Sequence, residues 1–204
     1  MIVLALLGIY LGLAFGLRSY LQLRRTGSTG FRGISGAPWS AAWLGGVLFL
    51  VALVGSVAAP LLARFAFDRP VVHGGLGLDL LGAALFAAGT WFLLWSQGAM
   101  GRSWRIGVDA REATALVTSG PFAWVRNPIF SAMMLSALGV VALLPNRTAL
   151  AAFALLVLAI ELQVRCVEEP YLERGHGEAY RAYRRRVGRF VPGLGLAPAP
   201  RGSV

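Results

Sequence analysis

Five stretches of this 204-residue chain are almost free of charged side chains and long enough to cross a bilayer. A transmembrane helix needs about 20 predominantly apolar residues, and few soluble folds contain several such segments. The stretches are residues 1–17 with an extension to 23, a segment within 33–63, and residues 80–97, 128–144 and 148–164. With 57% hydrophobic and 14% charged residues, the sequence predicts an all-α integral membrane protein with about five transmembrane helices and a cytoplasmic C-terminal helical segment.

The arginines indicate how these helices are oriented. All 19 basic side chains are arginine, and sixteen of them fall in the first loop, the third loop and the C-terminal tail. Only Arg64, Arg69 and Arg147 fall in the second and fourth loops. By the positive-inside rule we expect the N-terminus outside and the C-terminus in the cytoplasm. In so apolar a chain, the net charge of +10 indicates contact with anionic membrane lipids and not with nucleic acid.

Polar residues gather in two predicted cytoplasmic segments, the third loop and the C-terminal segment. In the second, Glu161, Arg165 and Glu168 or Glu169 fall at helical spacings that would form one polar ladder. Such a ladder either consists of ion pairs that let the helix leave the bilayer or provides groups that bind a ligand. One cysteine excludes an internal disulfide, and two separated histidines argue against a zinc site, so we expect no bound metal.

Asn127 and Pro128 have two interpretations. Asparagine is a good N-cap and proline suits the first helical turn, so the pair starts the fourth helix. A helix N-terminus that faces the cytoplasm also presents free N–H groups and the positive end of a dipole, which suit a carboxylate or a phosphate. If Glu168 and Glu169 lie nearby, the site combines an anion receptor with an anionic patch and would suit a zwitterionic, cationic ligand.

Three motifs resemble those of a known family. They are LVTSGPFAWVRNPIF at residues 116–130, EEPYL at 168–172 and GEAYRAY at 177–183. In this order and spacing they closely resemble the isoprenylcysteine carboxyl methyltransferase family and its phospholipid methyltransferase relatives, over about residues 80–192. The upstream GRSWR at 101–105 is similar to the bacterial branch, which implies the inner (plasma) membrane of a bacterium.

The resemblance implies S-adenosyl-L-methionine as the methyl donor, bound at the cytoplasmic face by the fourth and fifth helices and the C-terminal segment. We accordingly expect a two-helix membrane part at residues 1–75, a methyltransferase core at 76–192 and a flexible tail at 193–204. Carried over by position, the residues expected to bind the cofactor are Asp109, Thr114, Ala115, Leu116, Val117, Phe122, Asn127, Pro128, Ile129, Phe130 and Glu168.

The resemblance also implies roles in the reaction. Arg165 lies near the position of the family's substrate-binding arginine and would orient an acceptor carboxylate, whereas Glu169 is the nearest base for an amine acceptor. Asn127 stands where the family usually has histidine, and asparagine cannot titrate near neutral pH. A carboxylate needs no base, so we expect carboxyl O-methylation of an isoprenylcysteine-like or other lipophilic acid. The alternatives are N-methylation of an amine-headgroup phospholipid and a non-catalytic membrane subunit.

Overall fold

The computed structural model describes residues 1–30, 33–34, 36–101 and 115–198, and over these ranges the regular structure is helical. The all-α prediction is therefore confirmed. The two backbone bridges within the described ranges are isolated pairs, Pro70 with Asn146 and Val125 with Gly188. In chain order the elements are α1 (Ile2–Leu11), η1 (Gly12–Leu17), α2 (Arg18–Thr26), α3 (Ala41–Arg64), α4 (Leu76–Met100), η3 (Gly120–Ala123), α5 (Pro128–Leu143), α6 (Arg147–Gln163), η4 (Val164–Glu168) and α7 (Glu169–Arg186).

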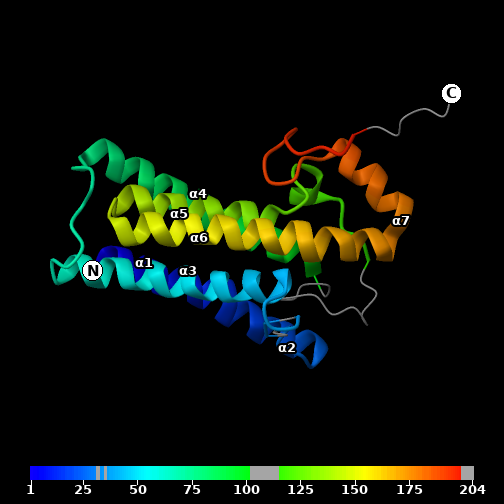
Figure 1. The fold of residues 1–204 in the computed structure, drawn as a ribbon, viewed down its shortest axis with the longest axis horizontal. Coiled ribbons are helices and arrows are strands. Elements are labelled where there is room, and N and C mark those ends of the chain that lie inside the picture. The colour runs from blue at the N-terminus through cyan, green and yellow to red at the C-terminus, as the bar shows by residue number, and fades with distance from the viewer. Residues whose placement is uncertain (31–32, 35, 102–114, 199–204) are drawn as a thin grey trace.

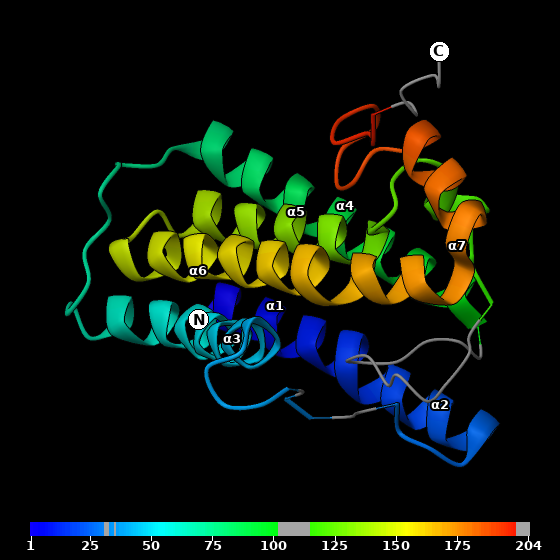
Figure 2. The same ribbon diagram turned by 45° about the vertical axis from the view of Figure 1, so that its right-hand side comes forward.

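Four continuous helical stretches are long and apolar enough to span a bilayer: Ile2–Thr26, Ala41–Arg64, Leu76–Met100 and Arg147–Arg186. The fifth apolar helix, α5, has 16 residues and is the shortest of the set. The apolar helices occupy the five predicted stretches, and the integral membrane architecture is confirmed. Figures 1 and 2 show α4, α5 and α6 in one layer and α1, α2 and α3 in a second, with α7 turning away at one end.

Glycines let α4 and α5 pack closely. A Cβ atom on Gly139 would lie 2.5 Å from the backbone nitrogen of Phe86, and one on Gly82 would lie 2.9 Å from the Gly139 carbonyl oxygen. Neither position has room for a side chain, because backbone atoms of the facing helix lie within 3.0 Å of the added Cβ atom. Inside a bilayer the hydrophobic effect does not drive helices together, so close van der Waals packing between small residues stabilises the helix pair instead.

The end of the molecule opposite α7 is closed by the short connection between α5 and α6. Asn146 is fully buried there, where its side chain accepts a hydrogen bond from the Ala149 amide at 2.8 Å and donates one to the Ala59 carbonyl at 3.1 Å. The Asp68 carboxylate accepts from the Thr148 amide at 2.8 Å. These contacts supply acceptors to the first turn of α6 and tie the hairpin to the end of α3.

Two π-helical turns interrupt otherwise continuous α-helices. The turn η1 lies in the first span, where the Ala14 carbonyl accepts a hydrogen bond from the buried Gln97 side chain at 2.9 Å. The turn η4 joins α6 to α7. A π turn contains one extra residue and so rotates the side chains that follow it, and such turns are frequent at functional sites. Beyond η4, the helix bends at Gly177, which has a positive φ of 51°.

Candidate functional site

A cavity of about 630 Å³ lies where α4 ends, α5 begins and α6 continues into η4. Helices α3 and α6 form one side, and α5 with the 115–127 segment forms another. Its lining residues include apolar side chains of η1 and α3, polar side chains near the motifs and three tyrosines of α7. They are Phe15, Ser19, Gly33, Ile34, Ala42, Gly45, Gly46, Phe49, Leu50, Leu53, Gln97, Met100, Ala115, Leu116, Val117, Phe122, Arg126, Asn127, Pro128, Ile129, Phe130, Met133, Ala159, Ile160, Gln163, Glu168, Tyr171, Leu172, Tyr180 and Tyr183.

The structure brings most of the predicted cofactor residues to this one cavity. Asp109 and Thr114 lie outside the described residues. Arg165 and Glu169, predicted to act on the acceptor, are not among the lining residues. The predicted cofactor residues that line the cavity are Ala115, Leu116, Val117, Phe122, Asn127, Pro128, Ile129, Phe130 and Glu168.

Asn127 precedes α5 as expected, but its side chain makes no capping hydrogen bond. Its amide group instead donates to the Arg189 carbonyl at 3.2 Å, and its backbone N–H donates to the same oxygen at 3.1 Å. The first-turn amides of Ile129 and Phe130 therefore have neither an intrahelical acceptor nor an Asn127 cap. Both residues line the cavity, so the positive end of the α5 dipole lies at its wall.

A buried ion cluster stands beside this helix start. The Arg126 Nη2 and Arg189 Nε atoms both lie 2.8 Å from the Glu169 Oε1 atom, and Arg189 Nη2 donates to Oε2 at 2.9 Å. The Arg126 and Glu169 side chains are only 1% and 7% exposed. The hydrogen bonds that Arg189 donates to Glu169 outweigh partial burial and raise the pKa of Arg189 above its usual value. Both oxygens of Glu169 are thus engaged by guanidinium groups.

The predicted polar ladder is only partly formed. Arg165 pairs with Glu161 four residues earlier, and its side chain is 55% exposed, whereas Glu168 lines the cavity. In a regular α-helix these three side chains would share a face, but Val164–Glu168 is a π turn. A π turn changes the direction of the side chains that follow it, so the α-helical spacing does not hold across these residues. The sequence spacing alone carried no sign of this turn.

Two buried tyrosines of α7 cover one side of the cavity. Tyr180 and Tyr183 are 1% and 4% exposed, and the Tyr183 hydroxyl donates to the Phe122 carbonyl at 2.5 Å. This face of α7 packs against the protein and does not lie on a membrane surface.

The chain after α7 forms a strap along the beginning of α5. The Arg126 N–H donates to the Gly188 carbonyl at 2.8 Å, and the Ser131 hydroxyl donates to the Phe190 carbonyl at 2.7 Å. Further along, the Arg126 Nη2 atom donates to the Gly195 carbonyl at 3.1 Å. Part of the segment expected to be a flexible tail therefore contacts the core, while residues 199–204 lie outside the described ranges.

Sequence reasoning missed the contribution of the first two membrane helices to the cavity. Phe15 and Ser19 line it from the first, and Gly45, Gly46 and Phe49 line it from α3. These segments carry no motif, so only their apolar character could be predicted. It also missed Arg126 as a buried cation, although Arg126 lies inside the quoted motif.

Comparison with known proteins gives three findings. The profile of the phospholipid methyltransferase family matches residues 78–179. Protein-S-isoprenylcysteine O-methyltransferase of Schizosaccharomyces pombe is 35% identical over 77 residues, which are 38% of this chain and 33% of the relative. The matched region thus spans about a third of the length of that relative.

The third finding concerns the fold. The solved structure of a eukaryotic intramembrane Ras methyltransferase, ICMT (isoprenylcysteine carboxyl methyltransferase), superposes with a TM-score of 0.59. The match covers 95% of this chain and 68% of the other, at 19% sequence identity. At this identity the likeness shows a shared membrane fold. Because the family profile covers half of the chain, including the motifs at 116–130 and 168–172 that line the cavity, the chain belongs to the phospholipid methyltransferase family.

Proposed function

We propose that this protein is an integral membrane methyltransferase that transfers a methyl group from S-adenosylmethionine to the carboxylate of a lipophilic or lipid-linked acceptor. The observation that carries the proposal is the mixed lining of the cavity, in which motif residues with polar groups are joined by apolar residues of η1 and α3. A site that joins a polar cofactor to a membrane-borne acceptor needs both kinds of residue.

The motif residues of the cavity fit the cofactor. A carboxylate, Glu168, suits a cationic or ammonium group, and the start of α5 with Asn127 suits a carboxylate. Phe122 and Tyr180 provide aromatic surface that suits a flat heterocycle. The set therefore matches a zwitterion that carries an adenine ring, and it contains groups of both signs within one cavity.

The chemistry divides between cofactor and protein. When bound, S-adenosylmethionine supplies a methyl carbon on a positively charged sulfur. That methyl carbon would pass to the acceptor oxygen, and the electron pair of the carbon–sulfur bond would stay on sulfur. The ester and the thioether that result are both neutral at the reacting atoms. The protein holds the oxygen in line with the carbon–sulfur bond, and the buried Tyr180 and Tyr183 exclude water on the side of the cavity that α7 covers.

Among the described lining residues, Glu168 carries the acidic side chain and no histidine is present. If Glu168 holds the cofactor, an amine acceptor would find no separate base there, whereas a carboxylate acceptor needs none. Glu169 is held by Arg126 and Arg189, and we assign it to the scaffold of the site. This reasoning favours O-methylation over N-methylation. The second candidate, N-methylation of an amine-headgroup phospholipid, is favoured by the family whose profile matches the chain.

We also propose that the end of the molecule carrying α2 and α7 faces the cytoplasm of a bacterial inner membrane. Arg24, Arg25 and the arginines of α7 lie at this end, whereas Arg64 and Arg147 lie at the other. Reporter fusions after Arg201 and within residues 64–72 should report opposite sides of the membrane. Both fusions on one side would contradict this orientation.

The function is tested with isotopically labelled S-adenosylmethionine and purified protein in lipid nanodiscs. The acceptors are N-acetyl-S-farnesylcysteine, its methylamide as a matched control without a carboxylate, and phosphatidylethanolamine. We expect label only in the first product, released as methanol by mild alkali because a methyl ester hydrolyses and an N-methyl group does not. Alkali-stable label in phosphatidylethanolamine would support the second candidate, and label in no acceptor would contradict both.

A further inference from the structure

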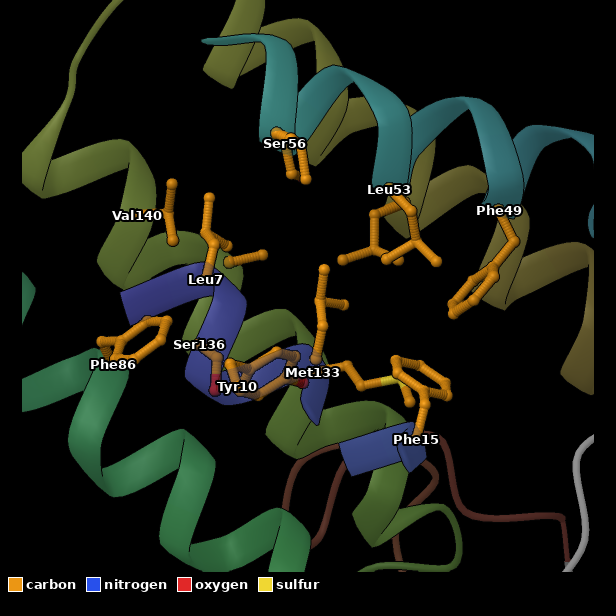
Figure 3. Close-up of a pocket in the computed structure, with 14 residues that line it drawn as sticks. Leu7, Tyr10, Phe15, Phe49, Leu53, Ser56, Phe86, Met133, Ser136 and Val140 are labelled. Carbon is orange, nitrogen blue, oxygen red and sulfur yellow. The ribbon is translucent and has the colours of Figure 1, made fainter. Parts of the chain in front are cut away.

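A second, smaller hollow extends from the cavity into the membrane part of the protein. It has a volume of about 40 Å³ and lies between α1, α3 and α5. Phe15, Phe49, Leu53 and Met133 line both the hollow and the main cavity, so the two spaces adjoin. Figure 3 looks into this hollow, with Leu7 and Tyr10 on α1, Leu53 on α3 and Val140 on α5. We call it the crevice.

The far end of the crevice is closed by buried side chains. The ring centroids of Tyr10 and Phe86 are 5.7 Å apart, and both residues are 7% exposed. Val140, 5% exposed, lines the same end from α5. Since α5 begins at Pro128, which lines the main cavity, its rise of 1.5 Å per residue places Val140 roughly 18 Å deeper. That depth is a little over half of the ~30 Å hydrocarbon core of a bilayer.

From this geometry we propose that the crevice receives the far end of the acceptor's hydrocarbon chain and that its closed end sets the longest chain the enzyme accepts. The inference rests on the proposed function and names a determinant of its acceptor. Continuity identifies the occupant, because a chain in the crevice must continue through Phe49 and Met133 to a head group in the main cavity. The lining of the crevice is mainly apolar, which suits a hydrocarbon chain, and its volume of about 40 Å³ leaves room only for the end of one.

Two substitutions should change the chain-length preference in opposite directions. Ala137→Leu places a larger side chain in the crevice before its closed end and should weaken the binding of long chains. Val140→Ala enlarges the closed end and should strengthen the binding of long chains. Matched controls lie on exposed helix surfaces that line neither space: Ala154→Leu on α6 and Val51→Ala on α3. The controls separate a loss of crevice volume from a general effect of the substitution on a membrane helix.

The measurement is the Kd of N-acetyl-S-geranyl, S-farnesyl and S-geranylgeranyl cysteine in nanodiscs, by competition with a fluorescent prenylcysteine, which requires no turnover. We expect Ala137→Leu to lower the ratio of long-chain to short-chain affinity by about tenfold, since a few methylene groups in an apolar pocket are worth that much. Val140→Ala should raise the ratio, and the controls should leave it unchanged. Parallel weakening of all three ligands, or an unchanged ratio in both crevice variants, would overturn the inference. Methyl transfer assayed separately would show whether the proposed function itself fails.

Discussion

Two carboxylates eight residues apart, Glu161 and Glu169, form ion pairs of opposite character. Glu161 and Arg165 pair along one helix, with side chains 33% and 55% exposed. Glu169 pairs with Arg126 and Arg189 from two other segments, and those three side chains are between 1% and 15% exposed. The first ion pair joins neighbouring residues of one helix and is exposed to solvent. The second cluster joins segments that are distant in sequence and is buried.

The difference shows which charges hold the site together. The buried group joins the residue before Asn127, the start of α7 and the strap after it, so three segments that surround the cavity meet at Glu169. An exposed pair within one helix contributes roughly 0–1 kcal/mol and fixes no such junction. Removing one partner of a buried pair typically costs about 3–5 kcal/mol, because the other charge stays buried without compensation.

Glu169→Gln should therefore have the largest effect on stability. We expect a loss of about 3–5 kcal/mol in the free energy of unfolding, because Arg126 and Arg189 would remain buried beside a neutral amide. The measurement is reversible unfolding in mixed micelles followed by circular dichroism. Glu178→Gln is the matched control, since Glu178 also pairs with two arginines but its side chain is 65% exposed. Equal losses in the two variants would contradict the contrast drawn between buried and exposed clusters.

Glu168→Gln should keep the fold and weaken the binding of S-adenosylmethionine. We expect a loss of about 1.5–3 kcal/mol in binding free energy, the range for a hydrogen bond to a charged group. Calorimetric titration measures it, with Glu161→Gln on the exposed pair as the control that keeps its affinity. Unchanged affinity in folded Glu168→Gln protein would remove Glu168 from the cofactor site.

Arg165→Gln should have the smallest effect on stability, within about 1 kcal/mol, because an exposed pair along a helix contributes little. Arg165 does not line the cavity, so its role toward the acceptor rests on the family resemblance alone; on that assignment S-adenosylmethionine affinity should persist and turnover should fall. Thermal melting, calorimetry and initial rates at saturating cofactor test the three parts. Turnover that falls only in proportion to the folded fraction would show that Arg165 has no role toward the acceptor.

The sequence alone predicts much of the fold, because length and apolar character determine where a chain crosses a bilayer. The predicted fourth helix, 128–144, ends one residue beyond α5, and the predicted fifth, 148–164, nearly coincides with α6. Local spacing also found the pair of Glu161 with Arg165. It failed at Glu168, because a π turn follows from tertiary contacts and not from a residue pattern.

The parts of the site that sequence reasoning missed depend on contacts between distant segments. Glu169 is 43 residues from Arg126 and 20 from Arg189, and no periodicity connects such positions. Apolar lining of the cavity comes from Phe15 and Phe49, which look like ordinary membrane-facing residues until the helices are packed. Motif resemblance, in contrast, named residues that line the cavity, because most of them belong to the single stretch 115–130.

The central claim is that the cavity beside α5 binds S-adenosylmethionine, and its most direct test is calorimetric titration of the purified full-length protein in nanodiscs. The account predicts saturable binding at one site per chain, prevented by prior addition of S-adenosylhomocysteine and present without any acceptor. Absence of saturable heat from protein whose circular dichroism shows intact helices would contradict the claim.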